Sequence, residues 1–335
     1  MRWVQAIGLV ALATGLPVSA HAADAAQPRA EVALREVRLP NGARRYAVPM
    51  TLGGTAIEAG LDTGSVGLRV LSRATANARV EATTRPTTYS YTSGTRFKGV
   101  VAKAVLALGE VSGPVPVDII QTVDCRPEKP ACPAAHADPA TFGIQGDGLP
   151  GAGFAAIFGI NMGEDEVANP LVKLGVARWI VELPKPGDAG PGRLILNPTA
   201  DETAGYIMFP IDRTLKDTRG GAHDAIDGCL SDRRTQQTLC GAVVLDSGAP
   251  GIRLVAAEPG KPWTADDPAQ IVFVKDGKPA LAADFVVDRR DQASHVTADA
   301  EPQMRVPHLY AGLMPYFAFD VLYDPGHGEI GLKPR

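Results

Sequence analysis

The chain lacks the features of a disulfide knot, of a disordered protein and of a nucleic-acid binder. It has four cysteines in 335 residues, too long a chain for a small fold held by disulfides. Its hydrophobic fraction of 45% is too high for a disordered protein. It has no long Lys/Arg run and a formal net charge of -4, so it lacks the cationic surface that neutralises phosphates. We therefore expect no nucleic-acid partner.

No apolar run is long enough to cross a membrane. Val4 to Leu16 follows Arg2 and leads to Ala20-His21-Ala22, the order of features in a cleaved secretory signal. This run is shorter than the roughly 20 residues that a membrane helix needs. Residues 1–22 are therefore predicted to be a signal peptide, with no stable membrane anchor after cleavage and a periplasmic or secreted protein. An uncleaved anchor is the alternative.

The cysteines are even in number, as expected in an oxidising compartment, and lie at Cys125, Cys132, Cys229 and Cys240. Of the three possible pairings we expect the two local ones, Cys125 with Cys132 and Cys229 with Cys240. No CxxC pair is present and the six histidines are scattered, so no metal site is expected. No motif indicates an organic cofactor.

The 36 glycines and 28 prolines indicate a turn-rich, strand-rich protein. Predicted strands are Val100–Leu108, Val115–Val123, Arg193–Leu196, Tyr206–Ile211, Ile271–Val274 and Leu281–Val287. Asp276-Gly277 predicts a hairpin turn, with the second strand beginning after Lys278-Pro279. One helix is expected at Asn169–Leu174, with Asn169 as N-cap and Gly175 after its end.

The most informative feature is an internal repeat. Leu61–Val70 reads LDTGSVGLRV and Leu245–Leu254 reads LDSGAPGIRL, with five of ten positions identical. The two aspartates, Asp62 and Asp246, lie 184 residues apart (246 minus 62), a little over half of the chain without its signal. This spacing is expected if each half of the chain is one copy of a duplicated lobe.

Two lobes related by a pseudo-twofold axis would bring the equivalent loops together, so Asp62 and Asp246 would face each other. Carboxylates at about 3 Å share one proton, because both cannot be ionised at once. One member can then accept a proton from water while the other donates one to a carbonyl oxygen. The alternative is that both tripeptides are ordinary turns, in which Asp and Gly are common.

These residues resemble the loops of pepsin-like aspartic proteases, whose two lobes each carry a hydrophobic-Asp-[Thr/Ser]-Gly loop. The similarity is ordered and extends from about residue 45 to the C-terminus. The segments that carry it are Tyr46–Leu61, Tyr89–Thr95 with Gly99-Val100-Val101 (the flap hairpin), Ala156–Ile160, Leu309–Leu313, Phe317–Asp320 and Ile330–Pro334. The pattern LDTGSxGLR is more similar to a bacterial, secreted branch of aspartic-protease-like proteins than to pepsin itself.

The resemblance implies an all-β, bilobal pepsin-like fold with a few short helices. It also implies roles for individual residues. Asp62 and Asp246 would be the catalytic pair, with Gly64 and Gly248 in their turns, Thr63 and Ser247 joining the two loops, and Ser65 bonding the outer oxygen of Asp62. Tyr91 is our choice for the flap tyrosine, with Tyr89 as the alternative.

The chain departs from the family at three positions. Ala249 stands where many members have Ser or Thr, so Asp246 loses a potential hydrogen-bond donor. Arg69 replaces the tryptophan that lies near the flap tyrosine in pepsin, and Arg253 is its counterpart in the second copy. The two arginines either place charge near the cleft or are exposed or structurally paired.

The expected organisation is a basic arm at residues 23–44, an N-terminal β-lobe at 45–186 and a C-terminal β-lobe at 187–335. The boundary is placed in the Pro/Gly-rich run Pro184–Gly192. The arm is either a short pro-segment lying across the acidic pair or a plain ordering arm.

The sequence thus predicts an exported, monomeric aspartic endopeptidase that acts on an extended polypeptide. The alternative is a secreted binding or inhibitor-like protein that keeps the fold without catalysis.

Overall fold

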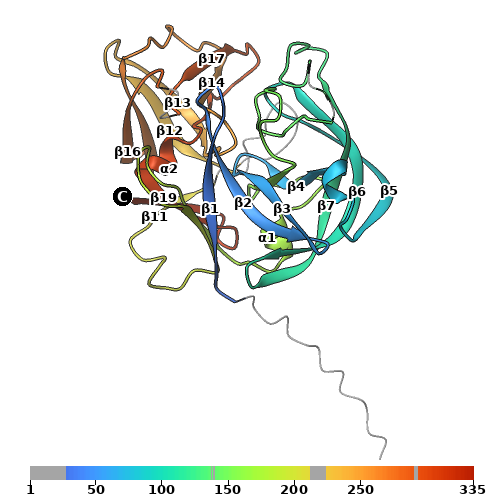
Figure 1. Ribbon diagram of the computed structural model, residues 1–335. Coiled ribbons are helices and arrows are strands. Elements are labelled where there is room, and N and C mark those ends of the chain that lie inside the picture. Colours follow the sequence, from blue (N-terminus) through green and yellow to red (C-terminus); the bar gives the residue numbers. More distant parts are fainter. Residues whose placement is uncertain (1–27, 137, 139, 212–223, 290–292) are drawn as a thin grey trace, which may run out of the picture.

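The computed structural model describes residues 28–136, 138, 140–211, 224–289 and 293–335 (Figure 1). The predicted signal peptide, residues 1–22, lies outside this range. The described residues form an all-β protein with one thirteen-stranded and one seven-stranded sheet. The expectation of an all-β protein is therefore confirmed.

The larger sheet has the strand order β11-β20-β19-β9-β10-β1-β2-β3-β8-β4-β7-β6-β5. Its strands are, in chain order, β1 (Ala30–Arg38), β2 (Arg44–Leu52), β3 (Thr55–Asp62), β4 (Val66–Leu71), β5 (Val80–Ser90), β6 (Thr95–Leu108), β7 (Val111–Cys125), β8 (Ala156–Ile160), β9 (Trp179–Glu182), β10 (Gly192–Leu196), β11 (Ile207–Pro210), β19 (Phe319–Asp324) and β20 (Glu329–Pro334). An additional pairing of β2 with β6 joins β2, β3, β8, β4, β7 and β6 into a closed ring.

The smaller sheet has the order β16-β15-β12-β13-β18-β14-β17. Its strands are β12 (Ala225–Asp232), β13 (Gln237–Val244), β14 (Ile252–Ala256), β15 (Pro268–Lys275), β16 (Lys278–Val286), β17 (Val296–Ala300) and β18 (His308–Tyr310). In Figure 1 this sheet and the strands β2–β7 lie on opposite sides of β1.

The two sheets contain the same arrangement of four strands. In the larger sheet β3 is parallel to β8, β8 antiparallel to β4, and β4 parallel to β7. In the smaller sheet β13 is parallel to β18, β18 antiparallel to β14, and β14 parallel to β17. The first decapeptide begins with the last two residues of β3 and continues into β4, and the second follows β13 and continues into β14. The sequence repeat therefore coincides with a repeat of strand order and direction.

Strand β1 contains part of the basic arm. Its first half pairs with β10 and its second half with β2, from Ala30↔Leu196 to Arg38↔Arg44. The Pro/Gly-rich run Pro184–Gly192 connects β9 to β10, which are neighbours in one sheet. Residues on both sides of position 187 thus belong to the larger sheet, and this run joins paired strands.

Every predicted strand overlaps a strand of the structure, although β6 and β7 begin at Thr95 and Val111, before their predicted starts, and one hairpin differs. Asp276 and Gly277 have positive φ angles of 52° and 73° and form the whole turn, because Lys275 pairs with Lys278. The prediction that the second strand begins after Pro279 is therefore wrong. A register shift between Phe273 and Val274 accommodates the hairpin. Pro279 is tolerated because β16 is an edge strand, where a missing N–H breaks no ladder.

The described part of the chain also contains three short helical segments, namely the 3₁₀ turn at Ser72–Thr75, α1 (Pro170–Lys173) and α2 (Met314–Ala318). The expected helix is confirmed as α1. Asn169 Oδ1 accepts from the backbone N–H groups of Leu171 and Val172, and Gly175 follows with a φ of +77°.

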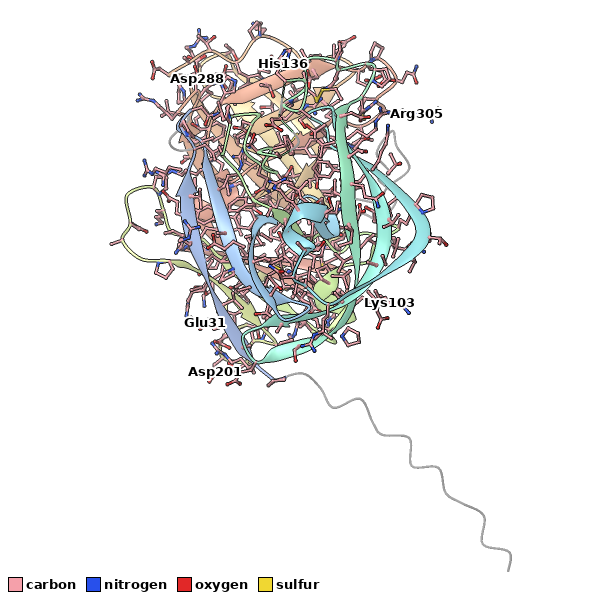
Figure 2. All side chains as sticks on the ribbon, turned by 45° about the vertical axis from the view of Figure 1, so that its right-hand side comes forward. Glu31, Lys103, His136, Asp201, Asp288 and Arg305 are labelled. Carbon is pink, nitrogen blue, oxygen red and sulfur yellow. A yellow bond between two sulfur atoms is a disulfide. The ribbon has the colours of Figure 1, made fainter. Side chains whose placement is uncertain are left out.

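The core consists of apolar side chains from both sheets in one continuous cluster that includes Leu61, Phe158, Leu245 and Leu309. Charged side chains such as Glu31, Lys103 and Arg305 lie at the periphery of the molecule (Figure 2). Among the described residues, no helix has the length and apolar character that a membrane crossing requires.

Candidate active site

The two repeated aspartates lie at equivalent places in the two sheets. Asp62 is the last residue of β3, and Asp246 comes two residues after the end of β13. Asp62 is 4% exposed. Beside each aspartate a parallel strand, β8 or β18, supports the backbone that carries it. The structure therefore brings together two residues that are 184 positions apart.

Each carboxyl group packs against the glycine of the other loop. A Cβ added to Gly64 would lie 2.4 Å from Asp246 Cγ, and one added to Gly248 would lie 2.6 Å from Asp62 Oδ1. The two carboxyl groups are also close enough for each to shift the pKa of the other. Glycine is thus required at both positions because no side chain fits between the loops.

Thr63 and Ser247 join the two loops below the carboxyl groups, as expected. The Thr63 hydroxyl donates to the Leu245 carbonyl (2.8 Å) and accepts from the Ser247 N–H (2.8 Å). In return, the Ser247 hydroxyl donates to the Leu61 carbonyl (3.3 Å) and accepts from the Thr63 N–H (3.1 Å). These reciprocal bonds set the relative position of the two aspartates.

The surroundings of the two carboxyl groups differ. Asp62 accepts from the Ser65 hydroxyl (2.7 Å) and from the Gly64 N–H (2.9 Å). Asp246 accepts from two backbone groups, the Gly248 N–H (3.0 Å) and the Ala249 N–H (3.1 Å). Ala249 offers no hydroxyl in the place that Ser65 occupies in the first loop.

This difference assigns the charge within the pair. Burial, followed by the charge of Asp62, raises the pKa of Asp246 to about 8. Burial also raises the pKa of Asp62, but the Ser65 hydroxyl, the Gly64 N–H and the Arg69 cation favour its ionised form. The interaction between the two carboxyl groups lowers the pKa of Asp62 and raises that of Asp246. These contacts favour the negative charge on Asp62 and the shared proton on Asp246.

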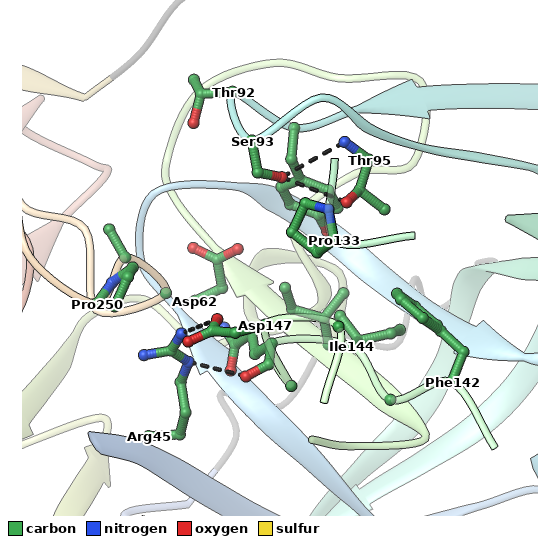
Figure 3. Close-up of a pocket in the computed structure, with 18 of the residues that line it drawn as sticks. Arg45, Asp62, Thr92, Ser93, Thr95, Pro133, Phe142, Ile144, Asp147 and Pro250 are labelled. Atoms are coloured by element: carbon green, nitrogen blue, oxygen red, sulfur yellow. Dashed lines mark hydrogen bonds and ion pairs between the residues drawn. The ribbon is translucent and has the colours of Figure 1, made fainter. Parts of the chain in front are cut away.

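A cavity of about 290 Å³ lies beside the pair (Figure 3). Its walls include both aspartates, the residues Tyr91–Ser93 of the turn between β5 and β6, and the apolar side chains of Phe97, Phe142, Ile144 and Ile157. An apolar chamber next to a proton-sharing pair can hold a side chain of a bound molecule while its polar group reaches the carboxyl groups.

Tyr91 lines this cavity, whereas Tyr89 packs behind it. The two rings meet edge to face with centroids 4.9 Å apart, and Tyr91 packs on Phe97 in the same way at 5.3 Å. The buried Tyr91 hydroxyl lies near Ser65 and Asp62, but it has no well-aligned hydrogen-bond partner in the described residues. Burial raises its pKa, so it is a neutral donor facing the site.

Arg69 is buried beneath these tyrosines. Its guanidinium stacks on the Tyr89 ring at 3.4 Å, donates to the Val66 carbonyl and pairs with Asp165 at 2.8 Å and Asp118 at 3.7 Å. Arg69 is thus structurally paired, and its charge also favours ionised Asp62. Its counterpart Arg253 pairs with Asp299 at 2.5 Å at a more exposed position.

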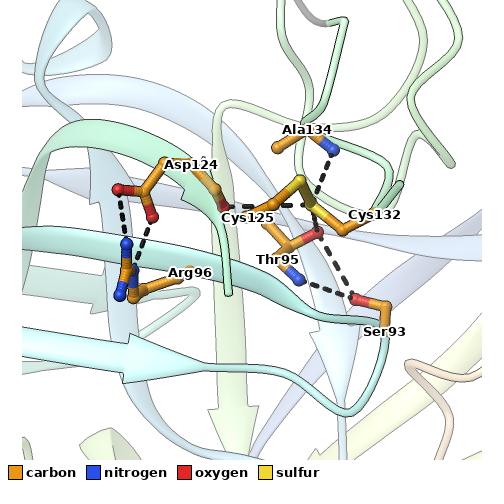
Figure 4. Close-up of a disulfide and its surroundings, with 7 residues drawn as sticks. All are labelled: Ser93, Thr95, Arg96, Asp124, Cys125, Cys132 and Ala134. Carbon is orange, nitrogen blue, oxygen red and sulfur yellow. Dashed lines mark hydrogen bonds and ion pairs between the residues drawn. A yellow bond between two sulfur atoms is a disulfide. The ribbon is translucent and has the colours of Figure 1, made fainter. Parts of the chain in front are cut away.

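The loop closed by the disulfide between Cys125 and Cys132 contacts the turn between β5 and β6 (Figure 4). Cys125 bonds Cys132, and the loop between them donates to the turn from the Arg126 N–H to the Gly94 carbonyl (2.8 Å). The Lys129 ammonium donates to the Thr92 carbonyl (2.9 Å). The turn is therefore attached to a covalently closed loop.

The second disulfide joins Cys229 of β12 to Cys240 of β13, which face each other across the two strands. Both expected pairings are confirmed. Disulfides of this kind are typical of proteins in oxidising compartments.

One cleft residue, Arg45, and one buried residue, Tyr316, were not predicted from the sequence. Arg45, 1% exposed, lines the cavity, pairs with Asp147 at 2.6 Å and donates to the Gln145 carbonyl at 3.0 Å. Tyr316 lies below the pair and donates to the Thr63 hydroxyl. No signal in the sequence marks them, because a buried arginine in a strand and a tyrosine in a short helix depend on distant partners.

No group of three or more His, Cys, Asp or Glu side chains that could hold a metal ion occurs within the described ranges.

Comparison with protein-family models gives no match. Comparison with curated proteins gives none either.

Proposed function

We propose that this protein is an exported aspartic endopeptidase with a pepsin-like bilobal fold. The repeated strand order supports two lobes related by a pseudo-twofold axis, each contributing one aspartate. The observation that carries the proposal is the reciprocal fit of the two loops, in which each glycine lies against the opposite carboxyl group. Two independent turns would not interlock in this way.

The first step adds water to the peptide carbonyl. Ionised Asp62 accepts a proton from a water molecule as the water oxygen bonds to the carbonyl carbon. Asp246 donates its proton to the carbonyl oxygen. The product is a neutral geminal diol, with Asp62 now protonated and Asp246 ionised.

The second step breaks the carbon–nitrogen bond. The leaving nitrogen takes the proton held by Asp62, and one diol hydroxyl returns a proton to Asp246. The products are a carboxylic acid and an amine, and both aspartates are back in their starting states. No covalent intermediate with the protein forms.

The walls of the cavity suit an extended polypeptide substrate. The hairpin with Tyr91 would act as the flap, and Tyr91 would cover the reacting group and exclude water. The apolar wall formed by Phe97, Phe142, Ile144 and Ile157 would receive a bulky apolar side chain next to the scissile bond.

Export to the periplasm or the medium is part of the proposal. It rests on the predicted signal at residues 1–22 and on the two disulfides, which persist in oxidising compartments.

The test is cleavage of an unfolded protein by the purified chain after residue 22, measured from about pH 3 to 9 to bracket a coupled carboxyl pair. We expect a bell-shaped profile. Activity falls at low pH as Asp62 becomes protonated, and it falls again as the pH rises through about 8, where Asp246 loses its proton.

Asp62→Asn and Asp246→Asn should each abolish cleavage. Asp276→Asn is the matched control, since it changes an aspartate to asparagine in an exposed turn where asparagine also accepts a positive φ. A folded wild type as inert as both site variants would overturn the peptidase proposal.

That outcome would favour the second candidate, a secreted binding protein that has lost catalysis. Ala249 favours this candidate, because Asp246 lacks the hydroxyl that its counterpart receives from Ser65.

A further inference from the structure

A pair of buried tyrosines lies beneath the joined loops. The Tyr316 hydroxyl of α2 donates to the Thr63 hydroxyl (2.7 Å) and contacts the Tyr323 hydroxyl of β19 (2.5 Å). Tyr316 is 0% and Tyr323 1% exposed. The C-terminal segment of α2 and β19 thus reaches the loop of Asp62 through two phenol groups.

The donors and acceptors can be arranged in only one order. The Thr63 hydroxyl has one proton, which it donates to the Leu245 carbonyl, while it accepts from Ser247 and Tyr316. The Tyr316 proton is used on Thr63, so Tyr323 must donate to Tyr316. The result is a directed chain from Tyr323 through Tyr316 and Thr63 to Leu245, the residue before Asp246.

The second copy has no such support in the described residues. The Ser247 hydroxyl makes only its two bonds with the first loop, at 3.1 Å and 3.3 Å. The three bonds at the Thr63 hydroxyl are shorter, at 2.7 to 2.8 Å. The hydroxyl that joins the loops most tightly is therefore the one that the tyrosines hold.

We propose that Tyr316 is a positioning residue that fixes the Thr63 hydroxyl and, through it, the backbone of Leu245 and Asp246. Its effect is to keep the Asp246 carboxyl group within hydrogen-bond reach of Asp62. The coupling between two carboxyl groups weakens as they separate, so their apparent pKa values depend on this support. A displacement of about 1 Å at a reacting group can cost about 100-fold in rate.

Other charged and titratable groups also lie near the pair, and they are all unchanged in Tyr316→Phe. They are Arg45 of β2, Arg69 of β4 and Tyr91 of the hairpin, with Tyr323 on β19 and Asp224 beside it.

The test is Tyr316→Phe, which removes one hydroxyl and keeps the ring. We expect kcat to fall about tenfold with little change in KM, because the substrate walls are untouched and a partial displacement costs less than the 100-fold of 1 Å. The two apparent pKa values of the pH profile should move closer together. Tyr323→Phe should act in the same direction with a smaller effect, since it leaves the bond from Tyr316 to Thr63 in place.

The matched control is Tyr46→Phe. Its hydroxyl is also buried and bonds a backbone carbonyl, that of Pro184 at 3.4 Å, in another part of the larger sheet. This variant should leave the kcat/KM profile against pH unchanged. If Tyr316→Phe behaves like Tyr46→Phe, Tyr316 has only a structural role and the inference is overturned.

The inference rests on the proposed function only for its kinetic readout. Titration of the aspartate carboxyl carbons by NMR in wild type and Tyr316→Phe measures the coupling directly, whether or not the protein cleaves peptides. Closer apparent pKa values in an inactive protein would support the positioning role while the peptidase proposal fails. If Tyr316→Phe does not fold, the same titration is measured in Tyr323→Phe. Apparent pKa values equal to those of the wild type in that variant would overturn the inference.

Discussion

The two copies of the loop make the same contacts at the carboxyl groups and differ in the residues that surround those groups. Asp, the following hydroxyl and the glycine make reciprocal contacts in both copies. Three positions after the aspartate, Ser65 bonds Asp62 while Ala249 offers only its backbone. Seven positions after it, Arg69 is buried and Arg253 half-buried. The two loops are thus equivalent in their backbone, but the surroundings of Asp62 and Asp246 differ. Such a difference is required if one carboxyl group is to accept a proton while the other donates one.

The arginines should show the largest difference in stability. Arg69→Met leaves Asp118, 1% exposed, and Asp165 without their cation, and breaking such a buried pair costs about 3–5 kcal/mol of unfolding free energy. Arg253→Met removes a pair open to solvent and should cost less than about 1 kcal/mol. Urea unfolding with both disulfides intact measures the two values. Equal losses would show that burial does not distinguish the two positions.

The glycines should show where the copies are equivalent. Gly64→Ala and Gly248→Ala each place a methyl group against the opposite carboxyl, so each should lower kcat/KM by about 100-fold through displacement of the pair. Gly326→Ala is the control, because its Cβ would meet its nearest neighbour at an ordinary 3.4 Å. A large loss in only one of the two site variants would contradict the reciprocal fit.

The smallest expected effect comes from exchanging the hydroxyl between the copies. Ala249→Ser offers Asp246 a donor that favours its ionised form, so its pKa falls from about 8 and the alkaline limb of the pH profile moves to lower pH. Ser65→Ala removes a donor from Asp62, so the pKa of Asp62 rises and the acid limb moves to higher pH. Maximum kcat/KM should change by no more than about tenfold, since one hydrogen bond contributes roughly 1 kcal/mol. If either limb of the pH profile shifts in the opposite direction in these variants, the assignment of the proton to Asp246 is wrong.

The parts of the site that depend on local chemistry could be predicted from the sequence. The repeat placed both aspartates, because a strand followed by Asp-[Thr/Ser]-Gly has the same local structure in each copy. The N-cap of α1 was predicted for the same reason, since Asn169 bonds groups two and three residues away. The roles of Thr63 and Ser247 came from the family resemblance, and their bonds across the loops agree with it.

The parts that depend on distant partners were not predictable. The bond from Tyr316 to Thr63 joins residues 253 positions apart, and the pair of Arg45 with Asp147 spans 102. A hydrophobic pattern reports which face of a strand is buried, and it does not report which polar side chain finds a partner there. The start of β16 was missed because a two-residue turn and a register shift together decide it.

Strand β1 has a consequence for the order in which the protein is built. Half of β1 pairs with β10, so Ala30 cannot form its strand pairing until Leu196 is present. The same sheet also contains β20, which ends at Pro334. Contacts this distant in sequence slow folding. A chain crossing a membrane with its N-terminus first would hold one edge of β1 unpaired until most of its length had followed. The first and last strands of the described residues belong to one sheet, so the larger sheet is complete only after β20 has followed.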